Sequence, residues 1–132
     1  MELTLPYDSE TEDCILGAVI SNPEEYNSVH KYIANKDVLY QTRAQLLWNK
    51  ITEMKRANQH IDTLTVCSSL NDKDTQKGLT SYYITKCTSN APVKGMAEYY
   101  ANQIYEKYLL RKVIVSSEEI KNKAKDNSKD VY

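Results

Sequence analysis

The sequence predicts an all-α protein: a small helical globule of about five short helices followed by one long C-terminal helix. Three observations support this prediction. The 132 residues include only three glycines and three prolines, whereas all-β and dinucleotide-binding folds need many glycines for turns and close backbone approach. Apolar residues recur at spacings of three and four along most of the chain, which is typical of amphipathic helices. Hydrophobic residues make up 41% of the sequence, enough for the modest core of one domain.

The first helix is expected to run from Ser9 to about Ile20. Ser9 and Glu12 form the Ser-x-x-Glu signature of a capping box. The acidic residues Glu10, Glu12 and Asp13 fall in its first turn, where the helix macrodipole favours negative charge. We interpret these acids as a solvated helix start rather than as a general acid–base set.

A second helix is expected to start at Ser21, with Pro23 in its first turn. Its apolar face consists of Tyr26, Val29 and Ile33. After an irregular link over residues 35–41, a third helix is expected from Thr42 to Ala57. The apolar side of this third helix consists of Leu46, Leu47, Ile51 and Met54.

Two shorter helices are expected in the following stretch. Asp62 or Thr63 caps a fourth helix, whose buried side is expected to consist of Leu64, Val66, Cys67 and Leu70. Residues 71–78 contain no apolar side chain and are interpreted as a solvated loop. A fifth helix over residues 79–88 is expected to present Leu79, Tyr82, Tyr83 and Ile84, and the sequence Asn-Ala-Pro at 90–92 ends it.

The last helix is expected to be the long one, from about residue 93 to residue 125. At 1.5 Å per residue it would measure roughly 48 Å, whereas a small domain is about 30 Å across. We therefore expect its distal part to project beyond the globule. The sequence is divided accordingly into a globular part, residues 1–92, and a part containing the long helix and the start of a hairpin or linker, residues 93–132. Alternatively, Ser116 and Glu119 cap a separate helix that folds back.

Apolar residues cover more of the long helix than one neighbour can bury, because a helix packed once onto a core needs a stripe only about 100° wide. The surplus predicts a second contact, with another chain. The candidate interface residues are Tyr100, Ile104, Tyr108, Leu109, Leu110, Val113 and Ile114. The competing interpretation assigns all of them to the core of the chain itself. The eleven tyrosines also suit partly buried surfaces and interfaces.

No motif for catalysis, cofactor binding or metal binding is evident, and we expect none of these sites. The phosphate loop G-x-x-x-x-G-K-[ST], H-E-x-x-H and G-x-S-x-G are all missing from the sequence. The three cysteines are widely spaced and the two histidines lie thirty residues apart, which does not suit a zinc site. The cysteines are interpreted as buried, reduced side chains. His60 precedes Asp62 by two residues, but we interpret it as an exposed loop residue.

Charge and hydropathy narrow the range of partners and locations. No apolar run reaches the roughly 18 residues of a membrane span, and the N-terminus does not resemble a secretion signal, so we expect a cytoplasmic protein. Basic residues are interleaved with acidic ones, unlike the compact basic surface of most nucleic-acid-binding proteins. A small DNA-binding module remains an alternative, in which the third helix would contact phosphates through Arg43, Lys50, Lys55 and Arg56.

Four segments, in order, carry a family pattern. The first is Leu5-Pro6-Tyr7-Asp8 with residues 15–20, the second is Leu39-Tyr40 with residues 45–48, and the third is Ile61-Asp62 with residues 64–66. The fourth and most specific runs from Asn90-Ala91-Pro92 to Ile114 and includes Glu98-Tyr99-Tyr100-Ala101 and Leu109-Leu110-Arg111. Together they resemble the N-terminal domain of DnaB-type replicative DNA helicases of bacteria and phages.

The resemblance implies a non-catalytic domain in which a helical globule is followed by a helical hairpin. Hairpins of neighbouring subunits pair in this family, giving a trimer-of-dimers collar on a hexameric ring that docks primase and, in some systems, a helicase loader. ATP and Mg²⁺, and most DNA contacts, are then expected only in a motor domain farther along the family chain. We expect the sequence to be part of such a longer chain, ending near the second hairpin helix. The alternative is a free-standing phage adaptor that binds a host helicase. The family often has proline where Gln41 and Thr42 stand here, so no partner-binding residue is assigned.

Overall fold

The computed structural model describes residues 4–131, with side chains through residue 127. The chain end at Tyr132, where we expect the second hairpin helix to begin, lies outside the described residues. The elements are α1 (Ser9–Ser21), the one-turn 3-10 helix η1 (Pro23–Glu25), α2 (Tyr26–His30), the 3-10 helix η2 (Lys36–Val38), α3 (Thr42–Arg56), α4 (Thr63–Ser68), α5 (Asp72–Gln76), α6 (Ser81–Ser89) and α7 (Ala97–Val131). This confirms the all-α prediction.

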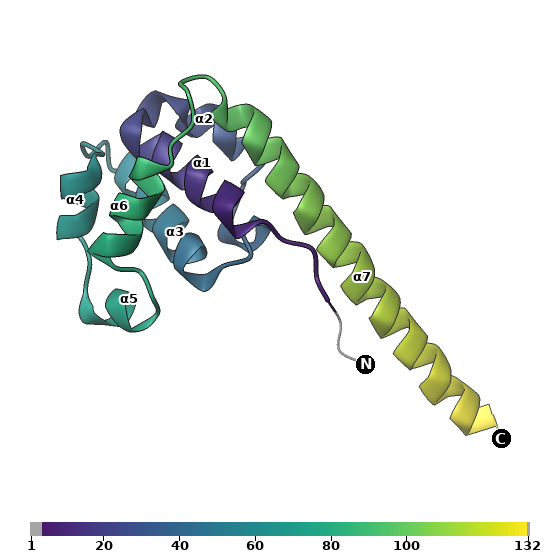
Figure 1. The fold of residues 1–132 in the computed structure, drawn as a ribbon. Helices are drawn as coiled ribbons and strands as arrows, with labels where there is room; N and C mark the ends of the chain where they lie inside the picture. The colour runs from purple at the N-terminus through teal and green to yellow at the C-terminus, as the bar shows by residue number, and fades with distance from the viewer. Residues whose placement is uncertain (1–3, 132) are drawn as a thin grey trace.

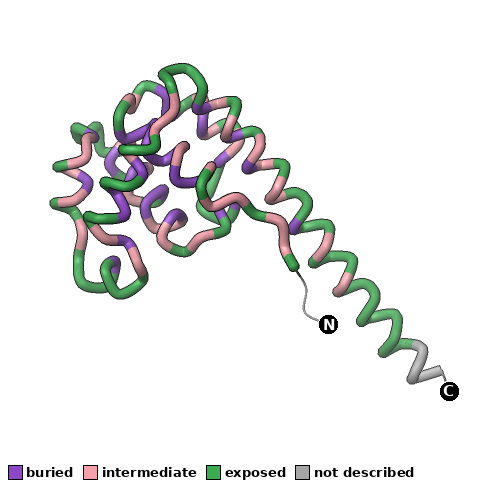
Figure 2. Tube along the Cα trace, in the orientation of Figure 1, coloured by how far each residue is buried: buried purple, intermediate pink, exposed green. Residues whose placement is uncertain are grey.

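Helices α1–α6 form a globule, and α7 runs along one side of it before projecting away (Figure 1). Its 35 residues correspond to a rod of about 52 Å. The helix is continuous through Ser116 and Glu119, so the alternative of a separate helix that folds back is wrong. Figure 2 shows the consequence for burial: buried residues gather in the globule and on the near half of α7, and the far half is exposed.

Helix α1 lies at the centre of the globule, where it contacts α3, α6 and α7. Its apolar residues from Ile15 to Ile20 are at most 2% exposed. Gly17 lets α6 approach closely, since a Cβ atom at this position would lie 1.8 Å from the carbonyl oxygen of Cys87. On the far side of the core, the rings of Tyr26 and Trp48 stack with centroids 5.0 Å apart.

Two local expectations are wrong. Asp8, not Ser9, is the N-cap of α1, and its carboxylate accepts hydrogen bonds from the Thr11 N–H (3.1 Å) and hydroxyl (2.8 Å). The stretch 71–78 is not a loop, since it contains α5, whose start is closed by a capping box between Asn71 and the buried Asp74. Polar caps of this kind satisfy the free N–H groups at a helix start without any apolar residue.

The buried sides of two short helices also differ from expectation. Leu64 is 74% exposed and Tyr82 is 80% exposed. Helices as short as α4 and α6 turn only a narrow face toward the core, so that face is filled by Val66 in α4 and by Tyr83, Ile84 and Cys87 in α6. Cys14 and Cys67 are only half-buried, whereas Cys87 is fully buried, and all three are free.

Helix α7 starts four residues later than expected. Gly95 has φ +95°, a backbone conformation that L residues with a side chain rarely adopt. The Met96 N–H bonds to the Val93 carbonyl in a turn, so the helix begins only at Ala97. This turn sets the direction in which α7 leaves the globule.

Candidate self-association surface

The near half of α7 is packed onto the globule. Ala97, Ala101 and Ile104 are at most 1% exposed, and the helix contacts α1 and α2. The two alanines repeat at spacing four, which places them on one side of the helix. Their small side chains allow α7 to lie close against the globule.

Polar contacts hold the start of α7. The Gly95 N–H donates to Glu25 Oε1 at 2.6 Å. Two exposed ion pairs lie nearby, between Lys31 and Glu98 (3.1 Å) and between Lys94 and Glu24 (2.9 Å). The Lys94 ammonium lowers the pKa of the Glu24 carboxyl. Surface pairs of this kind add little stability, so apolar packing and the buried Glu25 bond position the helix.

Arg111 marks the point where α7 leaves the globule. Its Nη1 donates to the Pro6 carbonyl (3.0 Å) and its Nη2 to the Val38 carbonyl (2.9 Å). The guanidinium carbon lies 5.4 Å from the Tyr40 ring centroid and 5.9 Å from that of Tyr108. Arg111 is 8% exposed, and burial lowers its pKa. One side chain thus joins α7 to the N-terminal segment and to η2.

Glu12 supports the same junction from α1. It is fully buried and accepts hydrogen bonds from the Tyr40 N–H (2.7 Å), the Gln41 N–H (3.2 Å) and Gln41 Nε2 (3.2 Å). Burial raises the pKa of Glu12, and these hydrogen bonds act in the opposite direction. The interpretation of Glu12 as part of a solvated helix start is therefore wrong.

Asp13 is the second buried acid of α1, at 2% exposed. It accepts hydrogen bonds from the Tyr83 hydroxyl (2.6 Å) and Gln41 Nε2 (3.1 Å), and the Lys86 ammonium lies 3.7 Å away. Burial, together with Cys87 and this acid, raises the pKa of Tyr83, which therefore stays protonated and donates. Asp13 ties α1 to α6.

Beyond the packed half, α7 presents an apolar surface to solvent. We call the exposed residues Tyr99, Leu109, Leu110, Val113 and Ile120 the outer stripe; their exposed fractions lie between 42% and 68%. Since successive helical residues are about 100° apart, Leu109, Val113 and Ile120 fall within about 40° of one another around the helix axis. By the same geometry, the outer stripe lies roughly opposite Ala97 and Ile104. Nothing in the described part of the chain covers it.

The candidate interface residues are divided between these two sides. Ile104 is 1% exposed and belongs to the core of the chain itself. Tyr100 and Tyr108 are half-buried and pack against the core, and Ile114 is half-buried farther along the helix. Leu109, Leu110 and Val113 lie on the outer stripe. Sequence reasoning did not select Tyr99 or Ile120, although Ile120 follows Val113 by seven residues and so shares its face.

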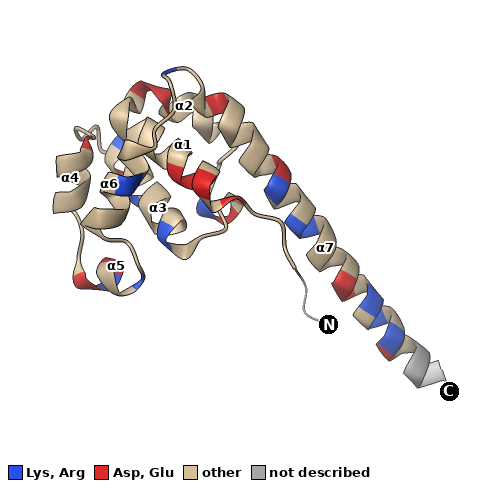
Figure 3. Cartoon of the chain, in the orientation of Figure 1, with Lys and Arg blue, Asp and Glu red and all other residues tan. Residues whose placement is uncertain are grey.

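Charged residues of both signs alternate along α7 (Figure 3). The basic residues of α3 are mostly engaged within the chain. Arg43 lies over the Tyr83 ring at 4.1 Å, Lys50 pairs with Asp74 at 2.9 Å, and Lys55 Nζ is 3.5 Å from the Pro23 carbonyl. These contacts engage three of the four cations within the chain.

Two other kinds of site are missing from the described residues. None of these helices is both long and apolar enough to cross a membrane. No group of three or more His, Cys, Asp or Glu side chains is placed to hold a metal ion. His60 Nε2 lies 2.9 Å from Asp62 Oδ2, but both side chains are exposed, and Asp62 serves as the N-cap of α4.

The fold has a counterpart among solved structures. The crystal structure of the N-terminal domain of DnaB helicase from Mycobacterium tuberculosis matches with a TM-score of 0.87 at 20% sequence identity, covering 95% of this chain and 89% of that one. At this identity the match shows the fold alone: the chain has the architecture of a helicase N-terminal domain.

The sequence comparisons show the family. The family model described as the DnaB-like helicase N terminal domain matches residues 4–106, and the chain belongs to this family. It is 26% identical over 110 residues to the replicative DNA helicase DnaC of Bacillus subtilis (strain 168), and 26% identical over 117 residues to the replicative DNA helicase DnaB of Buchnera aphidicola subsp. Baizongia pistaciae (strain Bp). The matches cover 83% and 85% of this chain but only 24% of each helicase.

Proposed function

We propose that this domain joins copies of its own chain in the assembly of a replicative DNA helicase, by pairing the outer stripe of α7 with the same stripe of a second copy. The single observation that supports this most is the exposure of Leu110 and Val113, at 51% and 62%, on a helix whose opposite face is already buried. Monomeric proteins rarely leave a contiguous apolar surface open to water without a partner for it.

The test is the oligomeric state of the Leu110→Asp variant. Burying a leucine contributes about 1.5–3 kcal/mol, and a two-fold interface contains the residue twice, so we expect the dissociation constant to rise by at least about a hundredfold. Val113→Asp should act in the same direction. Sedimentation equilibrium over a range of concentrations measures the change, and circular dichroism checks that the helix content is retained.

Asn122→Asp is the matched control. Asn122 is exposed on the same helix, and at about 100° per residue it lies on the side opposite the outer stripe. This variant adds the same charge and should associate like the wild type. A wild type that stays monomeric at millimolar concentration, or a Leu110→Asp variant that associates as tightly as Asn122→Asp, would contradict the proposal.

The remaining roles follow from the family rather than from the geometry. We propose that the globule, residues 1–92, and the projecting region, residues 93–132, act together as a collar module that docks primase and, in some systems, a loader. The collar is expected to be a trimer of dimers on a hexameric ring. ATP, Mg²⁺ and most DNA contacts belong in this proposal to a motor domain outside the sequence. Co-sedimentation of this chain with primase from the same organism tests the docking; no co-sedimentation at concentrations where the chain self-associates would refute it.

A further inference from the structure

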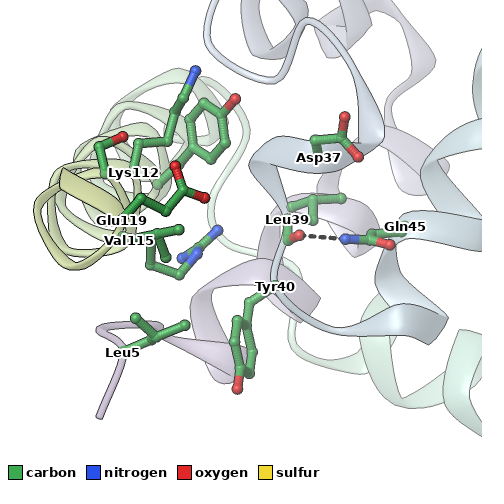
Figure 4. A pocket seen from close by; sticks show the side chains of 11 residues that line it. Leu5, Asp37, Leu39, Tyr40, Gln45, Lys112, Val115 and Glu119 are labelled. Atoms are coloured by element: carbon green, nitrogen blue, oxygen red, sulfur yellow. Dashed lines mark hydrogen bonds between the residues drawn. The ribbon is translucent and has the colours of Figure 1, made fainter. Parts of the chain in front are cut away.

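A groove of about 350 Å³ lies where α7 leaves the globule. It is bounded by α7 on one side, by the N-terminal segment below, and by the link between η2 and α3 opposite (Figure 4). Leu5, Leu39, Tyr40 and Val115 give it apolar walls. Val115 follows Arg111 by one helical turn, so this groove lies on the globule side of α7, away from the outer stripe.

Arg111 is the one buried charge among the residues that line the groove. Asp37, Lys112 and Glu119 also line it, but all three are exposed, whereas Arg111 is 8% exposed. A guanidinium has five N–H donors, and Arg111 uses one for Pro6 and one for Val38. Among the described residues it forms no ion pair. The nearby Glu12 has its two oxygens engaged by Tyr40 and Gln41.

The charge of Glu12 acts on Arg111 from beyond ion-pair distance. A distant carboxylate and two carbonyl groups replace only part of the hydration that the buried guanidinium loses. The planar guanidinium fork matches a carboxylate, and charge-assisted bonds of this type are stronger than neutral ones. None of the described carboxylates lies within ion-pair distance of the Arg111 guanidinium, so a carboxylate from another molecule can pair with it. Because the walls of the groove are apolar, the residue next to the incoming carboxylate should be apolar as well.

We propose that this groove accepts a glutamate or aspartate side chain, flanked by a large aliphatic residue, from a segment of a partner protein. The volume lies at the small end of ligand sites and suits one or two side chains rather than a whole helix. Tyr40 and Val115 at its rim are exposed, so the groove is open for an extended segment to lie against α7. This site is separate from the outer stripe and does not depend on self-association.

The probe is the peptide acetyl-Gly-Leu-Glu-Leu-Gly-amide, titrated into the full chain and followed by ¹H–¹⁵N NMR. We expect saturable shifts at the Arg111 Nε–H and at the backbone amides of Tyr40 and Val115. The peptide with Gln in place of Glu should bind at least about tenfold more weakly, because the charge-assisted bond is lost. Absence of shifts at millimolar peptide, or equal binding of the two peptides, overturns the proposal.

A variant pair tests the location without disturbing Arg111. Val115→Glu tethers a carboxylate to the wall of the groove and should weaken peptide binding by about tenfold or more, whereas Val115→Gln has nearly the same size and should bind close to the wild type. Undiminished binding to Val115→Glu would place the peptide elsewhere and overturn the proposal. Free isovalerate supplies the same chemistry without a chain; if it bound as tightly as the peptide, the assignment to a partner protein would be wrong.

Discussion

Substitution of Gly17 by alanine tests the close approach of α6 to α1. The added Cβ atom would lie 1.8 Å from the Cys87 carbonyl oxygen and 2.4 Å from its carbon. Ordinary contact begins near 3.4 Å, so α6 must recede from α1 by about 1.6 Å. The obstacle is main chain and cannot rotate away, so we expect a gross cost of about 4 kcal/mol, above the usual overpacking range of about 1–3 kcal/mol.

Alanine regains about 1 kcal/mol over glycine inside a helix, so we expect a net loss near 3 kcal/mol. For a domain of this size that corresponds to a melting temperature lower by about 10 °C. Thermal and urea unfolding followed by circular dichroism measure it. Gly95→Ala is the control, because its Cβ meets nothing within 4 Å and only the positive φ is unfavourable, at about 1–2 kcal/mol. Equal stability of Gly17→Ala and Gly95→Ala would refute the predicted clash between α1 and α6.

Two further predictions concern α1. Asp8→Ala should cost about 1 kcal/mol because it removes the N-cap, and Ser9→Ala should cost much less; equal losses in urea unfolding would argue against Asp8 as the cap. The folded-state pKa of Glu12 is raised above its ordinary value of 4.5, so the native state holds this proton more tightly than the unfolded state. The resulting stability is fully present below about pH 4.5 and is lost as pH rises through the folded pKa. The melting temperature of the wild type relative to Glu12→Gln should therefore fall between pH 4 and pH 8, and a rise would contradict the buried site.

Helix positions could be predicted where periodicity and length agree. The spacing predicts the third helix over 42–57, and this helix occupies Thr42–Arg56, because a four-turn apolar stripe with regular spacing has few alternative structures. The projection of α7 also follows from length alone. Short helices were less predictable, since α5 depends on reciprocal caps at Asn71 and Asp74 rather than on apolar spacing.

The interface residues could be predicted only as a set. The sequence shows that α7 is apolar on too many sides, but not which residues the globule covers. Its contact with α1 and α2 removes Ile104 from the available surface and leaves Leu109, Leu110 and Val113 exposed. The side of α7 that faces the globule depends on the turn at Gly95 and on the hydrogen bonds of Arg111. The turn depends on a backbone angle that composition does not reveal, and Arg111 bonds to residues distant in sequence.

The sequence by itself determined that this protein is helical, that its last helix extends past its core, and that its segments match the N-terminal domain of a replicative helicase. These properties depend on local spacing and on chain length, both of which can be read residue by residue. Only the tertiary structure decided that Glu12 and Asp13 are buried connectors, that Arg111 lines a groove, and that one face of α7 remains open. Each of these depends on which groups more than twenty residues away come into contact, because burial changes the electrostatic environment of a side chain without changing its local sequence.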